Sequence, residues 1–88
     1  MRTKRRNGLE VTRDILKVCM EGASKTRIVY RANLNAERLT TRLEALLWMG
    51  LVRANQDDGG RASYKTTVQG RRFLEGYFAE RIGKRIEP

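Results

Sequence analysis

Residues 27–43 read RIVYRANLNAERLTTRL, and two segments with apolar residues at helical spacing are joined there by only ANLN at 32–35. Asn33 is one of the few residue types besides glycine that tolerate a left-handed backbone, so it can end the first segment. Leu34 is then expected to point inward, and Asn35 can accept hydrogen bonds from the free amides of a following helix. The stretch therefore predicts two helices set at an angle by a tight turn.

The helix before this turn is predicted over residues 25–32, with Ser24 as its cap and Ile28, Val29 and Ala32 toward the core. The helix after the turn is predicted over residues 36–49 and ends at Gly50. Its core side carries Leu39, Leu43, Leu46 and Leu47. Its opposite face presents Glu37, Arg38, Thr41, Ala45 and Trp48, with Arg42 and Glu44 on the flanks.

A first helix is predicted within NGLEVTRDILKVCMEG at 7–22. Asn7 and Glu10 have the spacing of a capping box, and Gly22 supplies a left-handed stop. The expected apolar stripe consists of Leu9, Ile15, Leu16, Cys19 and Met20.

A β-hairpin is predicted after Gly50, because LVRAN at 51–55 and ASYKTT at 62–67 flank the turn-rich QDDGGR. Asp58, Gly59 and Gly60 can take positive φ there. Thr67 can cap a last helix that begins at Val68 and is weakened locally by its glycines at 70, 76 and 83. Its apolar residues are Phe73, Leu74, Tyr77, Phe78, Ile82 and Ile86.

This order of elements predicts an α+β fold, mostly α, of the winged helix-turn-helix type: three helices, a two-stranded hairpin wing and a C-terminal helix. We divide the chain into a basic N-terminal arm (residues 1–8), the winged helix-turn-helix domain (9–67) and the C-terminal helix (68–88). That helix is expected to dimerise the protein, because a chain of this size is marginally stable alone. Its predicted interface residues are Leu74, Tyr77, Phe78, Ile82 and Ile86.

The charge of the chain points to a polyanionic partner. The sequence has 19 Lys and Arg against 10 Asp and Glu, a net charge of +9. The arm holds four basic residues and no acid, and residues 24–42 hold five basic residues and one acid, so each contributes +4. A concentrated charge favours a binding face over an evenly solvated surface.

Catalytic, metal and membrane functions have little support in the sequence. The chain has one cysteine and no histidine, so a metal site or a Cys–His pair is not expected. We also see no phosphate-binding glycine loop and no apolar run of the roughly 18 residues that a membrane helix needs. We therefore expect no enzyme activity, no cofactor, no metal and no membrane partner, and a cytoplasmic, nucleoid-associated location.

The sequence also resembles the small archaeal winged-helix DNA-binding proteins, which include the "10a" chromatin-associated dimers. The resemblance rests on SKTRIVYRANLN (24–35), RLEALLWMGLV (42–52) and YKTTVQGRRFLEGY (64–77). It implies a homodimer held by the C-terminal helices in an antiparallel coiled coil, with the third helix and the wing presented to duplex DNA. It also implies a role in transcription regulation or chromatin architecture. Departures include Asp57 and Asp58 at the wing tip, where phosphate contact would favour Lys or Arg.

The candidate DNA-binding residues follow from this arrangement. The third helix offers base-edge and phosphate contacts, the second helix crosses the backbone, and the base of the wing and the arm add further basic groups. The set comprises Lys25, Arg27, Arg31, Asn35, Arg38, Thr41, Arg42, Arg53, Arg61, Lys65, Arg2, Lys4, Arg5 and Arg6.

Several of these residues have structural alternatives. Glu37 and Glu44 can pair with arginines on a merely solvated helix face, and Arg27 can brace a carboxylate inside the fold. The arm can be a basic terminus without a further role. We expect Trp48 to pack beneath the hairpin or the last helix. The alternative is a protein-interaction module that uses Trp48, Met49 and the C-terminal helix.

Overall fold

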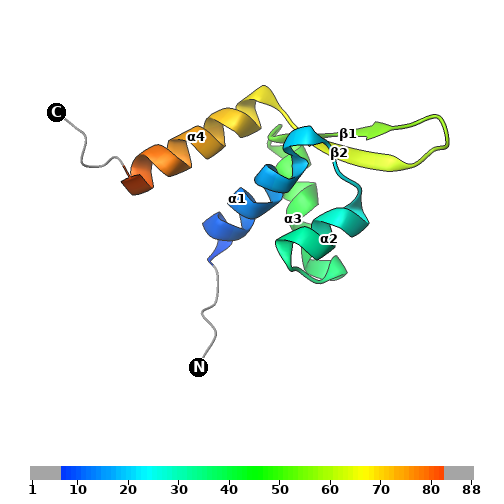
Figure 1. Cartoon of the computed structure of the whole chain (residues 1–88), viewed down its shortest axis with the longest axis horizontal. Helices are drawn as coiled ribbons and strands as arrows, with labels where there is room; N and C mark the ends of the chain where they lie inside the picture. Colours follow the sequence, from blue (N-terminus) through cyan, green and yellow to red (C-terminus); the bar gives the residue numbers. More distant parts are fainter. Residues whose placement is uncertain (1–6, 83–88) are drawn as a thin grey trace.

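The computed structural model describes residues 7–82, with side-chain surroundings for residues 7–76. The elements are α1 (Gly8–Val18), the 3-10 turn η1 (Cys19–Glu21), α2 (Lys25–Ala32), α3 (Ala36–Trp48), β1 (Val52–Gln56), β2 (Ala62–Thr66) and α4 (Val68–Ile82). Figure 1 shows α1, α2 and α3 gathered around one core, with the hairpin projecting to one side and α4 to the other. The predicted mostly helical, winged fold is confirmed.

The turn between α2 and α3 forms as its sequence predicts. Asn33 adopts a left-handed conformation with φ 57°, and its amide donates to the carbonyl of Val29. Leu34 is buried. The amide of Arg38 donates to Asn35 Oδ1 at 2.7 Å, so Asn35 caps α3. Three consecutive residues thus stop one helix, anchor the chain and start the next.

The starts of α1 and α2 are also capped as predicted, each by the side chain of the residue just before the helix. The Glu10 amide donates to Asn7 Oδ1 at 2.8 Å, and the Asn7 amide donates to Glu10 Oε1 at 3.3 Å, which completes a capping box. The Arg27 amide donates to Ser24 Oγ at 3.2 Å. Such caps satisfy amides that a helix leaves free at its N-terminus.

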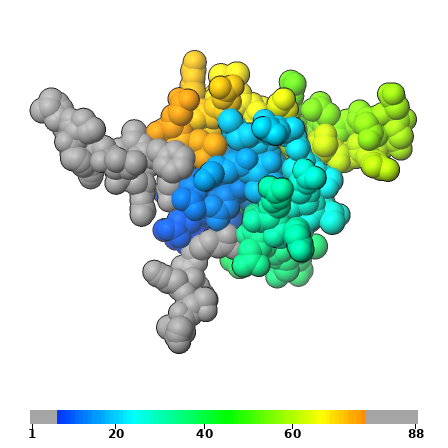
Figure 2. Space-filling model, in the orientation of Figure 1, coloured from blue at the N-terminus to red at the C-terminus, as the bar shows by residue number. Residues whose placement is uncertain are grey.

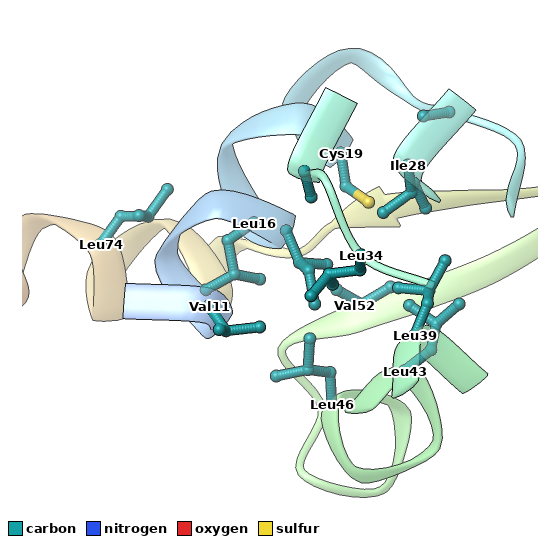
Figure 3. Close-up of a cluster of buried hydrophobic side chains, with 13 residues drawn as sticks. Val11, Leu16, Cys19, Ile28, Leu34, Leu39, Leu43, Leu46, Val52 and Leu74 are labelled. Carbon is teal, nitrogen blue, oxygen red and sulfur yellow. The ribbon is translucent and has the colours of Figure 1, made fainter. Parts of the chain in front are cut away.

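The core is built by one apolar face from each of α1, α2 and α3 together with Val52 (Figure 3). The predicted stripe of α1 is wrong at two positions. Leu9 is 48% exposed and Met20 is also exposed, whereas Val11 and Thr12 are buried. The reason is that Leu9 and Met20, which are about three helical turns apart, project beside each other at the edge of the buried face, whereas Val11 and Thr12 project into it.

The hairpin is joined to the helices by an isolated β-bridge that the sequence pattern does not reveal. Ala23, between η1 and α2, pairs with Tyr64 of β2 through two backbone hydrogen bonds of 3.0 and 2.8 Å. Inside the domain, the Thr66 hydroxyl donates to the carbonyl of Leu16 at 2.7 Å. These bonds fix the base of the wing to α1 and to the start of α2.

Helix α4 begins where predicted, because the Gly70 amide donates to Thr67 Oγ1 at 3.0 Å. Leu74 is 7% exposed and belongs to the core of its own chain, so most of its side chain is already covered without a second subunit. Val68, by contrast, is exposed. Among the described residues, no helix is long and apolar enough to cross a membrane.

Candidate nucleic-acid interface

The outer face of α3 forms the centre of the candidate site. Its core side is occupied by Leu39, Leu43 and Leu46, with Leu47 packed against the core, so the side chains of the opposite face turn outward. Glu37, Arg38, Thr41, Arg42 and Ala45 line a surface hollow of about 450 Å³. This hollow brings together all three residues of α3 that the sequence predicts as DNA contacts. Donors, an acceptor and methyl groups therefore share one exposed face of a rigid helix.

Arg42 and Asn35 are each held by a neighbouring part of the chain. A Cβ atom at Gly8 would lie 2.9 Å from Arg42 Nη2, so the guanidinium rests against the start of α1 and is partly buried. Asn35 Oδ1 is occupied by the Arg38 amide. Arg38 and Thr41 remain exposed, which makes them the most accessible residues of the predicted set on α3.

On α2, the predicted phosphate-contacting side chains Lys25, Arg27 and Arg31 are exposed. Arg27 and Arg31 line a second hollow of about 390 Å³ beside η1. Within residues 7–76 no carboxylate forms an ion pair with Arg27, so the bracing role is not observed there. Tyr30, a residue that our sequence reasoning omitted, is 85% exposed on this helix. The sequence could have indicated this exposure, because Tyr30 lies three residues after Arg27 and on the side of the helix opposite the core.

At the base of the wing, two predicted basic residues lie near Arg71, which the sequence analysis did not predict as a DNA contact. Arg53 and Lys65 are directly opposite each other in the antiparallel register. With Arg71 of α4 they line a third hollow of about 550 Å³. Arg61 is exposed nearer the tip. Figure 2 shows the hairpin standing clear of the rest of the molecule, as a contact element must.

Asp57 organises the tip of the wing. Its Oδ1 accepts from the amides of Gly59 and Arg61, at 2.9 and 2.8 Å. Of the three residues expected to take positive φ, only Gly60 does, with φ 81°. The side chain of Asp57 replaces the extra left-handed residues by tying the turn together directly. Its presence at the tip therefore has a structural cause.

We predict that Asp57→Asn raises affinity for duplex DNA about threefold at low salt, because one negative charge leaves the wing while the amide oxygen still closes the turn. Fluorescence anisotropy at two salt concentrations measures the change. Asp57→Ala removes the same charge but also the turn bonds, and should cost about 1 kcal/mol of stability. An unchanged affinity with asparagine would show that the tip does not approach DNA.

The side chains of the remaining predicted residues lie outside the described part of the chain. Arg2, Lys4, Arg5, Arg6 and Ile86 are outside the described residues, and Tyr77, Phe78 and Ile82 lie on α4 beyond the described side chains.

Trp48 contradicts our expectation. It is 88% exposed and packs beneath neither the hairpin nor α4, and Met49 beside it is 55% exposed. The helical face of α3 that turns away from the core simply continues to its last residue.

Cys19 is buried, and burial raises the pKa of its thiol from 9.0 to about 11. It therefore stays protonated near neutral pH and acts as a core side chain. Within the described part of the chain, no group of three His, Cys, Asp or Glu side chains could hold a metal ion.

Two helices joined by a tight turn, a two-stranded wing after the second of them, and a basic, polar face on that second helix define a winged helix-turn-helix protein. The chain belongs to the winged helix-turn-helix family, whose family model matches residues 5–81.

Solved structures give the same result. Sso10a-2, a DNA-binding protein from Sulfolobus solfataricus, is 26% identical with a TM-score of 0.75, and the alignment covers 86% of this chain and 82% of that one. The resemblance to small archaeal winged-helix proteins is thereby confirmed. No curated protein matches the chain significantly in sequence.

Two transcription regulators share the fold at lower identity. MepR, a transcription regulator of the Staphylococcus aureus multidrug efflux pump MepA, has 15% identity and a TM-score of 0.71, over 80% of this chain and 55% of its own. BldR from Sulfolobus solfataricus has 21% identity and a TM-score of 0.68, over 85% of this chain and 61% of its own. At these identities the likeness establishes the fold alone.

Proposed function

We propose that this chain binds double-stranded DNA as a transcriptional regulator or chromatin architectural factor, with α3 in the major groove and the β1–β2 hairpin as its wing. The observation that carries the proposal is the exposed face of α3, where Arg38 and Thr41 share one hollow with the partly buried Arg42. These side chains are of the types that contact base edges and phosphates. Proteins of the winged helix-turn-helix family are DNA-binding regulators, not enzymes, in agreement with the predicted lack of catalysis.

The proposed interface has three parts. The α3 face contacts bases, the exposed cations of α2 and the wing contact phosphates, and the basic arm adds to the electrostatic attraction. The comparison with Sso10a-2, which binds DNA, supports this assignment. A DNA partner also supports a cytoplasmic, nucleoid-associated location.

Binding to DNA is tested by titrating a labelled mixed-sequence duplex with the protein at several salt concentrations, with double-stranded RNA as the control. With about six neutralised phosphates, affinity should fall about 10³-fold between about 50 and 200 mM salt. Absence of binding to the duplex even at the lowest salt concentration would exclude the proposed function.

We further propose that the protein is a homodimer joined through the C-terminal part of α4. The first part of α4 contributes Leu74 to the core, but a helix of 15 residues extends about 22 Å and outruns that contact. Figure 1 shows α4 leading away from the hairpin side of the molecule. The sequence continues after Leu74 with Tyr77, Phe78 and Ile82. A second chain would cover such apolar residues.

The dimer is tested by replacing Phe78 and Ile82 together with aspartate. We expect sedimentation to show a monomer, because two charges would have to be buried in the interface. Gln69→Asp, in the exposed first turn of α4, serves as a control and should remain dimeric. An unchanged mass of the double variant rejects this interface.

A second candidate function is a protein-interaction module, and the exposure of Trp48 and Met49 is the observation that favours it. The hydrogen bond from Thr67 Oγ1 to the carbonyl of Gly50 places the end of α3 beside the start of α4, where Val68 is also exposed. A protein partner at this end of α3 is compatible with DNA binding at its N-terminal half.

A further inference from the structure

Glu37 is the acidic residue among the five that line the hollow on α3, where it lies beside two arginines. It is the second residue of α3, it is exposed, and it lines the same hollow as Arg38 and Thr41. Within residues 7–76 it forms no ion pair or side-chain hydrogen bond, so its charge is not neutralised by the arginines beside it. The expectation that Glu37 pairs with a neighbouring arginine is not met in this part of the chain.

A free carboxylate in this position weakens attraction to DNA in general. Phosphates repel it, and it cancels one of the positive charges that bind the backbone. A favourable interaction with the N-terminal end of the helix dipole accounts for an acidic residue in the first turn. That interaction, however, would serve equally well from a residue turned away from the hollow. The orientation toward the reading face is the feature that requires a binding explanation.

The major groove allows an ionised carboxylate few partners. Guanine presents two acceptors there and thymine presents one, and all of them repel a group that can only accept. Adenine presents a donor directly beside an acceptor. Cytosine presents its N4 amino donor and no acceptor, so it is the base edge that suits a carboxylate best.

We propose that Glu37 makes the protein sequence-selective by accepting a hydrogen bond from the N4 amino group of a cytosine. This inference rests on the proposed placement of α3 in the major groove. Arg38, the next residue, supplies donors for the O6 and N7 acceptors of a guanine at the same or a neighbouring base pair. The ligand class is therefore duplex DNA that carries a C·G pair under the first turn of α3.

Thr41 adds an apolar contact to this reading face. Its hydroxyl donates to the carbonyl of Glu37 at 3.3 Å, one helical turn back. With the hydroxyl engaged by the backbone, the methyl group is the part of the side chain left for a partner. Thymine C5-methyl groups are the apolar features of the major groove. The reading face thus offers an acceptor for cytosine, donors for guanine and a methyl group for thymine, from Glu37, Arg38 and Thr41 in turn.

The test is site selection from a duplex library with a randomised centre, performed with the natural protein and with Glu37→Gln. Glu44→Gln is the matched control: the same charge change at another exposed residue of α3, which lies outside the hollow. For the natural protein we expect one position dominated by cytosine. Replacing that C·G pair in a selected site should weaken binding about tenfold.

Glutamine should move the preference at that position from cytosine toward adenine, because its amide can both accept from N6 and donate to N7. Both variants should bind mixed-sequence DNA more tightly, since each loses a negative charge, but the control keeps the cytosine preference. A loss of helix stability alone would not change the preferred base.

The outcomes are distinguishable. Tight binding of the natural protein without a cytosine preference overturns the role of Glu37 while leaving DNA binding intact. The same conclusion follows if the glutamine variant retains the preference. If the natural protein binds no duplex at low salt, the proposed function fails and the inference fails with it.

Discussion

Replacing Arg38 by glutamate is expected to weaken binding to duplex DNA about 100-fold at low salt. The side chain is exposed, lines the hollow on α3 and forms no ion pair within residues 7–76, so it is free to contact DNA. Its loss removes a base or phosphate contact worth about 1–3 kcal/mol, and the introduced carboxylate adds repulsion from the phosphates. Fluorescence anisotropy with one duplex, repeated over a salt series, measures the effect.

Two controls separate this effect from others. Arg72→Glu makes the same charge change on an exposed residue of α4 that borders none of the three hollows, and should reduce affinity much less. Trp48→Ala should leave DNA affinity nearly unchanged if α3 reads DNA through its N-terminal half. Equal losses of DNA affinity for Arg38→Glu and Arg72→Glu would show that Arg38 contributes only through the net charge of the protein. A larger loss for Trp48→Ala than for Arg38→Glu would place the main DNA contact at the C-terminal end of α3 instead.

Replacing Gly70 by alanine is expected to destabilise the fold by at least about 2 kcal/mol, or roughly 10 °C in melting temperature. Helix propensity alone predicts the opposite, a gain of about 1 kcal/mol. In the structure, however, a Cβ atom at Gly70 would overlap the carbonyl oxygen of Leu51 and lie 2.6 Å from Thr66 Cγ2. A backbone carbonyl cannot move aside as a flexible side chain can, so α4 must shift away from the hairpin. Thermal unfolding followed by circular dichroism measures the change.

Gly76→Ala is the matched control for this prediction. It lies in the same helix, and a Cβ atom there would meet nothing within 4 Å. This variant should therefore be stabilised by up to about 1 kcal/mol through helix propensity alone. If both variants gain stability, the close approach of α4 to Leu51 is not maintained in solution.

The helix-turn-helix itself could be predicted from the sequence because its signals are local. Each cap joins residues three positions apart: Asn7 to Glu10, Ser24 to Arg27, Asn35 to Arg38. The left-handed Asn33 and the buried Leu34 likewise depend on the residues of the turn. Such interactions form wherever the segment becomes helical, so residue type and spacing predict them.

The candidate site could be predicted only in part. The periodicity of α3 showed which residues turn outward, so Arg38 and Thr41 were identified. It did not show that Gly8 of α1 would meet the guanidinium of Arg42 or that Arg71 would join Arg53 and Lys65. These groupings connect residues that are distant in the chain. Spacing along one helix contains no information about them.

Residue type and spacing are enough to predict where all four helices start, where a tight turn separates α2 from α3, and which face of α3 stays outside the core. It takes the packed structure to show that Trp48 is exposed, that the backbone of Ala23 pairs with Tyr64, and that position 70 has no room for a Cβ atom. The physical reason is the range of the interactions. Caps and helical faces arise from bonds within about one helical turn, whereas exposure and close backbone approach depend on which distant segments pack together.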